Sequence, residues 1–431
     1  MCSVQSHPIV EPRLAATGAF LATLLICART AFAALPPVPV PAENPLTEPK
    51  RVLGKMLFWD EQLSSDRSIA CGTCHRPAQG GADPRVGRNP GVDKGTIDDV
   101  LGSPGIVTLD RDGHPVVNPQ FGAGPQVTPR AAPSNFGALW ADELFWDGRA
   151  GSRVTDPLTG KAAIARGGAL ENQVLTALVA PGEMAKRDRS WADVVDTVEH
   201  ARPLALASDL PKDVEAAREA RATYPALFEA AFGDSRITPI RIAFAIATYE
   251  RTLVSDQTPW DRYEAGDSSA IAGRALYGWR ALQAFHCTAC HTPPLFTNNA
   301  FFEIGVRRAA LDLGRQLVTH VSSDAGDMKV PTLRDAALLP RFMHTGEFGN
   351  LGAAVAFYIN APALPERDGI PGFGLYTFNM SQIDVADIRA FIEQALVDPR
   401  VRDETFPFDR PTLRSEREEP QPGSGTIGPS H

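Results

Sequence analysis

Two copies of one short motif constrain this chain more than any other feature of its sequence. Residues 71–75 read Cys-Gly-Thr-Cys-His, and residues 287–291 read Cys-Thr-Ala-Cys-His. The two thiols of a Cys-x-x-Cys-His segment can attach covalently to the vinyl groups of a haem, while the histidine ligates the iron. The sequence therefore predicts a c-type cytochrome that carries two covalently bound haems.

Each copy of the motif supplies two attachment residues and one iron ligand. The predicted residues are Cys71, Cys74, His75, Cys287, Cys290 and His291. Two alternatives remain open, namely a disulfide within each cysteine pair or one zinc site built from both pairs. Neither alternative explains why a histidine directly follows the second cysteine in both copies.

An apolar run near the amino terminus is typical of an export signal. Arg13 precedes the uncharged segment 14–28, and residues 31–33 (Ala-Phe-Ala) form a small-x-small cleavage site. The run is shorter than the ~20 residues that a membrane-spanning helix needs. We therefore expect residues 1–33 to be a cleaved signal peptide and the mature protein to be periplasmic, with no membrane span. A retained membrane helix, or a lipid anchor at Cys27, is the weaker alternative.

The charge of the chain bears on its partners. The formal net charge is -9, and no run is rich in lysine or arginine. Nucleic-acid binding through phosphate neutralisation is therefore not expected. The acidity suits a basic soluble partner, and it is equally an ordinary solubility charge for an exported protein.

The length and the wide separation of the motifs favour two domains with one haem each. Composition and motif positions together divide the chain into segments. We predict a proline-rich lead-in at 34–50, a first haem domain at 51–253, a second haem domain at 254–410 and a disordered tail at 411–431.

The predicted fold is mainly α, with two cytochrome c-like haem domains and long irregular loops. Helical periodicity is found at 50–58, 191–199, 214–232, 239–253, 268–285 and 383–396. Thr238 and Pro239 form a typical helix start for one of these segments. Between residues 78 and 134, glycine and proline recur without a helical period, and a loop of that length is usually functional.

Several blocks, in this order along the chain, resemble one family of proteins. They are residues 57–60 (Leu-Phe-Trp-Asp), 145–149 (Phe-Trp-Asp-Gly-Arg), 183–184 (Glu-Met), 249–253 (Tyr-Glu-Arg-Thr-Leu), 329–334 (Lys-Val-Pro-Thr-Leu-Arg) and 343–346 (Met-His-Thr-Gly). The pattern resembles the bacterial di-haem cytochrome c peroxidases, together with the related MauG branch of oxidases that mature a tryptophan-derived quinone cofactor. The resemblance spans about residues 50–400.

The resemblance implies a division of labour between the two haems. The haem at His75 would react with hydrogen peroxide, and the haem at His291 would receive electrons from a small redox protein, a cytochrome c or a cupredoxin. Trp146 matches the tryptophan that lies between the haems in the family. Its other interpretation, a large core side chain beside an Asp-Gly turn, stays open. A homodimer is also compatible with the resemblance.

Two further residues match the peroxide pocket of the family. Splitting the O–O bond requires a proton to move from one oxygen to the other, a task for a positioned carboxylate or histidine. Glu183 matches the family's glutamate for this step, and Gln173 matches a glutamine of the same pocket. Without the resemblance, Glu183 would be interpreted as a surface charge.

The sequence departs from the family in the loop that closes the first iron in many members. The position of their loop histidine holds Ala123 here. His114 is the only histidine in this loop and is better explained as a solvated side chain than as a ligand. We therefore predict a first haem whose iron is five-coordinate, or water-bound, without prior reduction.

Two ligand positions also differ from many peroxidases. The methionine that would be the sixth ligand of the second haem is replaced by Tyr358, the ligand type of the MauG branch, with Met343 as the alternative. A calcium ion often bridges the family's domains. The position of its asparagine ligand holds Ala131 here, so only the carbonyl oxygens of Leu339 and Arg341 remain as protein ligands. The prediction of a calcium site is therefore weakened.

Three functions follow as hypotheses. The leading one is a periplasmic peroxidase that reduces hydrogen peroxide to water. The second is a MauG-like oxidase of residues in a partner protein, favoured by Tyr358 and by Ala123. The third is a pure electron carrier with both irons closed, and a functional Glu183 beside an open iron argues against it.

Overall fold

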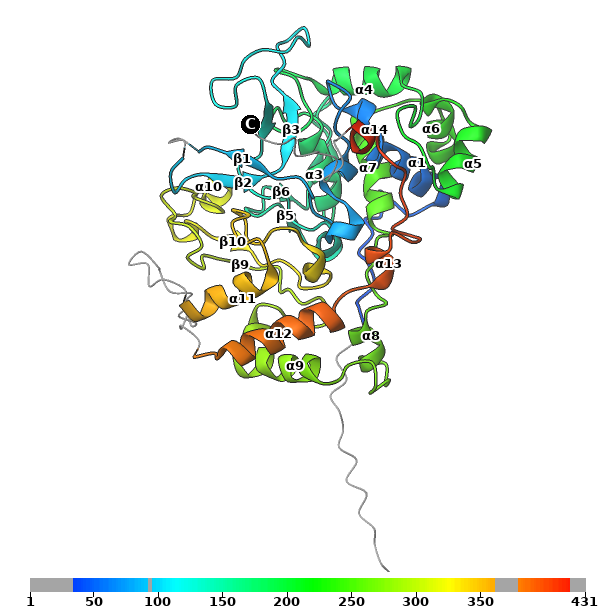
Figure 1. Ribbon diagram of the computed structural model, residues 1–431. Coiled ribbons are helices and arrows are strands. Elements are labelled where there is room, and N and C mark those ends of the chain that lie inside the picture. The colour runs from blue at the N-terminus through cyan, green and yellow to red at the C-terminus, as the bar shows by residue number, and fades with distance from the viewer. Residues whose placement is uncertain (1–33, 92–94, 361–378, 419–431) are drawn as a thin grey trace, which may run out of the picture. The chain divides into compact units, whose positions relative to one another are not determined.

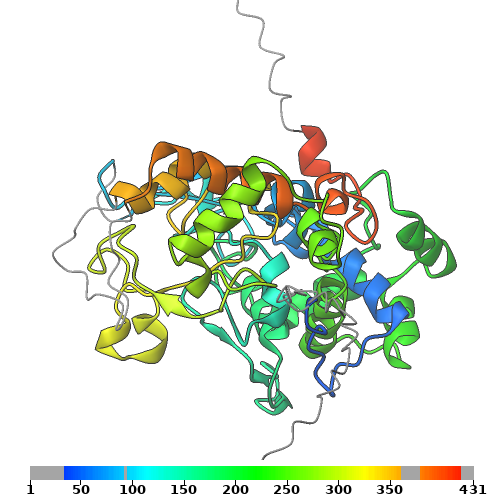
Figure 2. The same cartoon turned by 90° about the horizontal axis from the view of Figure 1, so that it is seen from below.

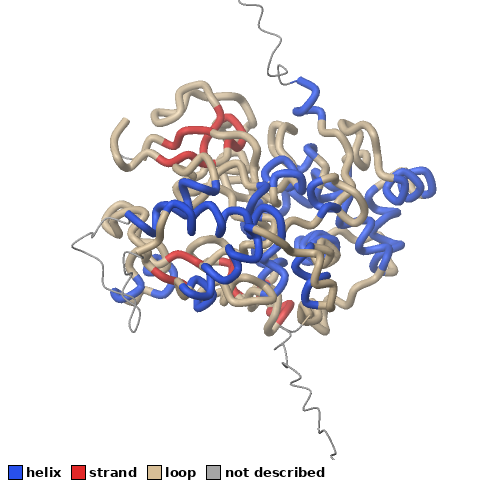
Figure 3. Tube along the Cα trace, turned by 60° about the horizontal axis from the view of Figure 1, so that its bottom comes forward, coloured by secondary structure: helices blue, strands red, loops and turns tan. Residues whose placement is uncertain are grey.

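Helices joined by long irregular loops make up most of the chain (Figure 3). The computed structural model describes residues 34–91, 95–360 and 379–418. The predicted signal peptide therefore lies outside the described residues. Within the described ranges, no helix is both long and apolar enough to cross a bilayer.

The helices follow in chain order and agree with the predicted mainly α class. They are α1 (Glu48–Phe58), α2 (Cys71–Cys74), α3 (Ala169–Ala177), α4 (Trp191–His200), α5 (Lys212–Ala220), α6 (Tyr224–Phe232), α7 (Pro239–Glu250), α8 (Pro259–Glu264), α9 (Arg274–Ala284), α10 (Gln316–Thr319), α11 (Leu351–Asn360), α12 (Gln382–Ala395), α13 (Pro399–Arg402) and α14 (Arg414–Glu418).

The strands are short and pair locally. They are β1 (Gly87–Asn89), β2 (Val100–Gly102), β3 (Pro104–Val107), β4 (Pro125–Val127), β5 (Glu143–Leu144), β6 (Ala150–Gly151), β7 (Val154–Thr155), β8 (Ala162–Ile164), β9 (Phe301–Phe302) and β10 (Met328–Lys329). Each pairs antiparallel with one neighbour, as β1–β2, β3–β4, β5–β6, β7–β8 and β9–β10. The loop predicted at 78–134 thus contains hairpins.

Each of two main hydrophobic cores is built on a pair of closely packed helices. In the first core α1 packs against α7, and in the second α9 packs against α12 (Figures 1 and 2). Both contacts occur at a glycine. A Cβ added to Gly54 would lie 1.8 Å from the Ala245 carbonyl oxygen, and one added to Gly278 would lie 1.9 Å from that of Asp387. These glycines let the helix backbones touch.

The two helix pairs also position the two motifs. Helix α1 ends shortly before α2, which carries the first cysteine pair, and α9 ends just before Cys287. The side chains of Trp59 and Trp260 lie fully buried in the first and second cores respectively. The two predicted haem domains, and their boundaries, remain a prediction.

The carboxy-terminal stretch departs from the predicted segments. Val401, Phe408 and Leu413 are fully buried in the first core, although the predicted second domain runs to residue 410. The predicted disordered tail at 411–431 is wrong for residues 411–418, which include α14. The Glu416 carboxylate pairs with Arg76 and Arg410 at 2.8 Å each, which anchors this acidic segment. Residues 419–431 lie outside the described residues.

One predicted helix is divided in two. The segment 214–232 forms α5 and α6, because Thr223 caps a new helix that has Pro225 near its start. The predicted helix start at Thr238 is confirmed, since the Thr238 hydroxyl accepts a hydrogen bond from the Arg241 amide at 3.2 Å.

We expect Gly54→Ala and Gly278→Ala each to destabilise the protein by about 1–3 kcal/mol, because the added methyl group overpacks a backbone contact. The expected sign opposes helix propensity, by which alanine would stabilise a helix interior by roughly 1 kcal/mol. Gly151→Ala is the control, since nothing lies within 4 Å of its added Cβ. Denaturant unfolding measures the effect, and unchanged or raised stability in both helix variants would contradict it.

Candidate active site

A large cavity of about 930 Å³ opens beside α2. The first motif contributes Cys71, Cys74 and His75 to its wall. The other predicted residues of this site, Trp146, Gln173 and Glu183, line the same cavity. Segments far apart in the sequence are therefore brought together around the first cysteine pair.

Local structure around α2 presents the cysteines to the cavity. The Ala70 amide donates a hydrogen bond to the Thr73 hydroxyl at 2.8 Å, which closes the start of the short helix. Gly72 lies on the Trp59 ring, so closely that an added Cβ would come within 2.2 Å of it. The Trp59 indole in turn donates to the Tyr249 hydroxyl at 3.1 Å. Blocks 57–60 and 249–253 thus support the motif.

The imidazole of His75 is oriented for metal binding. Its Nδ1 lies 2.9 Å from the Gly81 carbonyl oxygen, so the ring donates there and keeps the Nε2 lone pair free. Gly81 has a φ of +76°, and an added Cβ would meet the Asn135 side chain at 2.3 Å. Burial lowers the pKa of His75, which favours the neutral form that ligates metals.

The second motif has the same arrangement. The Nδ1 of His291 lies 3.1 Å from the Phe296 carbonyl oxygen, and burial lowers its pKa. Cys287 packs against the second hydrophobic core, and Cys290 is half-buried. The residues at both sites therefore fit a haem, with two thiols to attach it and one imidazole nitrogen for its iron.

The alternatives to haem attachment gain no support from the structure. Neither motif has its two cysteines joined in a disulfide. The cluster of three metal-ligating side chains found among the described residues does not contain them, so the two pairs do not build one zinc site.

Glu183 follows α3 in a loop that is held against β3. The Ile106 amide donates to the Glu183 carbonyl oxygen at 3.0 Å, and the Glu183 amide donates to the Ala180 carbonyl oxygen at 3.1 Å. Burial raises the pKa of the Glu183 carboxyl, and the charge of Arg149 partly opposes this rise. A cavity-lining carboxyl whose pKa is raised holds a proton more readily than a surface carboxylate, which suits a role in proton transfer.

Trp146 connects the two halves of the chain. Its indole donates to the Ala131 carbonyl oxygen at 2.8 Å, and its own carbonyl accepts from the Lys329 amide at 2.8 Å. Its ring lies edge-on to His344, with centroids 6.2 Å apart. These contacts fix the indole and its backbone against residues 131, 329 and 344, and the place of Trp146 between the haems remains a prediction.

Tyr358 lies beside the second cysteine pair. Burial raises the pKa of its phenol, and the nearby Cys287 and Cys290 add to the rise. Both Tyr358 and Met343 pack against the second core. The structure therefore brings both candidate ligands to this core, and the choice of Tyr358 remains a prediction.

The predicted calcium position offers a poor set of ligands. The Ala131 side chain has no donor atom, and its carbonyl oxygen already accepts from Trp146. The adjacent small cavity is lined by Arg85 and Arg341, and the Asp83 carboxylate in its wall pairs with Arg85 at 2.8 Å. These residues do not fit the ion.

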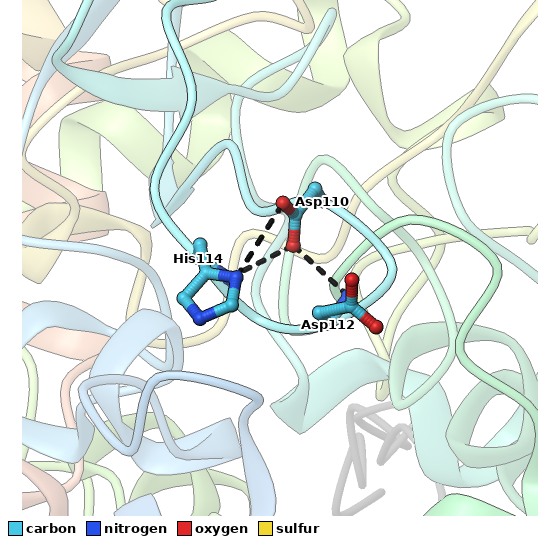
Figure 4. Close-up of side chains that lie close together, drawn as sticks. All are labelled: Asp110, Asp112 and His114. Carbon is cyan, nitrogen blue, oxygen red and sulfur yellow. Dashed lines mark hydrogen bonds and ion pairs between the residues drawn. The ribbon is translucent and has the colours of Figure 1, made fainter.

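His114 lies at an exposed turn (Figure 4). Its side chain is 77% exposed, and its Nδ1 lies 3.7 Å from an Asp110 carboxylate oxygen. Asp112 belongs to the same exposed cluster. The interpretation of His114 as a solvated loop side chain is therefore confirmed, and the open coordination of the first iron remains a prediction.

Sequence reasoning assigned no role to two other cavity residues. Glu250 ends α7 and is 6% exposed, and Lys329 precedes the Val-Pro-Thr-Leu-Arg block. Burial raises the pKa of Glu250 to about 8 and lowers that of Lys329 to about 8. Glu250 directly follows the apolar stripe of Ile242, Ile246 and Tyr249, a position that could have marked it as buried.

Comparison with known proteins decides the family. Residues 48–269, just over half of the chain, match the family described as di-haem cytochrome c peroxidase. The chain belongs to this family. It is therefore related to haem-containing oxidoreductases that carry two c-type haems, as the paired motifs predicted.

Relatives within the di-haem cytochrome c peroxidase family carry two kinds of name. The methylamine utilization protein MauG of Methylophilus methylotrophus is 29% identical, covering 86% of this chain and 92% of that protein. MauG of Methylorubrum extorquens is 31% identical, and the match covers 84% of this chain and 82% of that protein. Cytochrome c551 peroxidase of Pseudomonas aeruginosa is 28% identical, covering 74% of each.

Solved structures share the fold. A MauG-like protein associated with microbial copper homeostasis has a TM-score of 0.60 and 23% identity, covering 87% of this chain and 96% of that one. The diheme peroxidase BthA from Burkholderia thailandensis has a TM-score of 0.57 and 20% identity, and the match covers 89% of this chain and 94% of that one.

Proposed function

We propose that the protein is a periplasmic di-haem peroxidase that reduces hydrogen peroxide to two waters, with two electrons from a small redox protein and two protons. The observation that carries this proposal is the cavity, which contains His75 and Glu183 together. Relatives named cytochrome c peroxidase support it. The export pattern of residues 1–33 supports the location.

A haem held by Cys71, Cys74 and His75 would supply an iron at which the peroxide O–O bond is reduced. Glu183 takes a proton from one peroxide oxygen and delivers it to the departing oxygen, so that water leaves instead of hydroxide. Gln173, on α3 in the same cavity, orients the peroxide by hydrogen bonding. The exposed position of His114 leaves this face accessible to peroxide.

Trp146 has the position to assist electron transfer between the two sites. Its edge-on contact with His344 and its indole bond to Ala131 hold the ring in one orientation. An aromatic ring between two haems shortens each step that an electron must cross. The site at His291 would receive the electrons from a cytochrome c or a cupredoxin.

We expect Glu183→Gln to lower kcat for peroxide by roughly 10²–10⁴-fold, because the amide cannot relay a proton. Steady oxidation of a reduced cytochrome c by peroxide measures the rate, with haem content checked by absorbance. Glu229→Gln is the matched control, since Glu229 is an exposed residue of α6. Turnover of the Glu183 variant within twofold of the unmodified protein would contradict the assignment.

A second function, MauG-like oxidation of residues in a partner protein, is favoured by Tyr358 beside Cys287 and Cys290. The relatives named MauG agree with it. The two functions differ in the fate of the oxidising equivalents of peroxide. Under the second function they persist in the protein until a protein substrate is added, whereas a peroxidase consumes small redox donors steadily.

We expect Tyr358→Met to raise the midpoint potential of the second haem, because a thioether favours ferrous iron more than a phenolate does. Met343→Leu is the companion variant and should leave that potential unchanged. Spectroelectrochemical titration of both holoproteins measures the effect. A shift in the Met343 variant together with none in the Tyr358 variant would make methionine the ligand.

A further inference from the structure

Glu250 is a buried residue whose carboxyl group lines the cavity, and it has no role in the proposed reaction. It is the last residue of α7, it is 6% exposed, and it lines the same cavity wall as Cys71 and Glu183. The charges of Glu250 and Glu183 both raise the pKa of the Cys71 thiol, after the larger effect of burial. Both carboxyl groups are therefore electrostatically coupled to the first attachment cysteine.

Glu250 lacks a cation partner within the described residues. Its Oε2 atom has no hydrogen-bond partner there. The neighbouring Arg251 is fully engaged elsewhere, since its guanidinium donates to the two Glu171 carboxylate oxygens at 2.6 and 2.9 Å. Arg251 and Glu171 are both buried, so their charges largely cancel.

The other charged groups around α7 are also committed or distant from the cavity. On α1, the Lys50 ammonium donates to the Asn44 side-chain oxygen at 2.9 Å, and Arg51 and Lys55 pair with Asp213. On α4, the charged side chains are exposed, namely Asp193, Asp196, Glu199 and His200. An ionised Glu250 would thus be a buried charge without a counterion, which is costly.

A short chain of contacts connects Glu250 to the ligand histidine. The Asn135 side chain forms a hydrogen bond with Glu250. The backbone N–H of Asn135 donates to the Gly81 carbonyl oxygen at 3.3 Å, and His75 Nδ1 donates to the same oxygen. The charge state of Glu250 is therefore felt at the first site by a route separate from Glu183.

We propose that Glu250 is a redox-coupled proton site, which takes up one proton when the haem at Cys71 and Cys74 gains one electron and releases it on reoxidation. The physical reason is charge balance. The extra positive charge of ferric iron favours the Glu250 carboxylate, and ferrous iron favours the neutral acid. The electron comes from the redox protein of the proposed function, and the proton comes from solvent.

This inference deepens the proposed peroxidase function, because it places one of the two protons consumed per peroxide next to the first haem before peroxide arrives. Its test uses the reduction potential, and turnover is measured separately. The potential can lose its pH dependence while peroxide is still reduced. The proposed function can equally fail while the potential still depends on pH.

The experiment is a spectroelectrochemical titration of the first haem in the full-length holoprotein from about pH 6 to about pH 10. In the unmodified protein, we expect the reduction equilibrium to change up to tenfold per pH unit within this range, or ~59 mV for one electron. In Glu250→Gln, this dependence should disappear. Glu250→Asp retains the carboxyl group and should retain the dependence, and so should the exposed control Glu229→Gln.

Three outcomes would overturn the proposal. The first is a pH-independent reduction potential in the unmodified protein. The second is a pH dependence of the potential that is unchanged in Glu250→Gln. The third is a pH dependence that is lost in Glu183→Gln but retained in Glu250→Gln. The last outcome would assign the proton to Glu183.

Should Glu250→Gln not fold, infrared difference spectroscopy of the unmodified protein replaces it. Reduction of the first haem alone should then produce the C=O band of a newly protonated carboxylic acid. A spectrum without this band would refute the proposal.

Discussion

The hydrogen bond between His75 and the Gly81 carbonyl oxygen is the contact on which the rest of the account depends. It fixes which imidazole nitrogen faces the cavity, and it holds the ring beside Cys71 and Cys74. The tight turn at Gly81 that supplies the carbonyl also contacts Asn135, and through Asn135 the turn connects to Glu250. The cavity can therefore act as one site, because its predicted metal ligand and its buried acid are connected through Gly81 and Asn135.

The two halves of the chain share the same local structure around their motifs but differ in the residues that surround it. Each has a glycine-mediated helix contact, a Cys-x-x-Cys-His motif that follows the glycine-bearing helix, and a motif histidine whose Nδ1 lies at hydrogen-bond distance from a carbonyl oxygen. They differ in what surrounds the motif. A cavity with carboxyl groups surrounds the first, whereas aromatic side chains and Tyr358 pack around the second. In the proposed function, that difference in surroundings is what lets the first site react with peroxide while the second transfers electrons.

Local sequence patterns predicted the haem-attachment residues, the mainly α class and the helix that begins after Thr238, because each depends on residues close together in the chain. Contacts between distant residues could not be predicted in this way. The return of Val401 and Phe408 to the first core is one example. The state of Glu250 is another, since it depends on Arg251 being paired with Glu171, 80 residues earlier. The resemblance named Glu183, but only the structure placed its side chain in the cavity of His75.

The central claim is that one chain holds two haems in unlike surroundings, the first with an accessible iron and the second closed by a protein ligand. An electron paramagnetic resonance spectrum of the ferric holoprotein tests this claim most directly. The account predicts two haem signals of equal amount, one high-spin or water-bound from the site of His75 and one low-spin from the site of His291. A single haem signal, or two low-spin signals with a bis-histidine first haem, would contradict it.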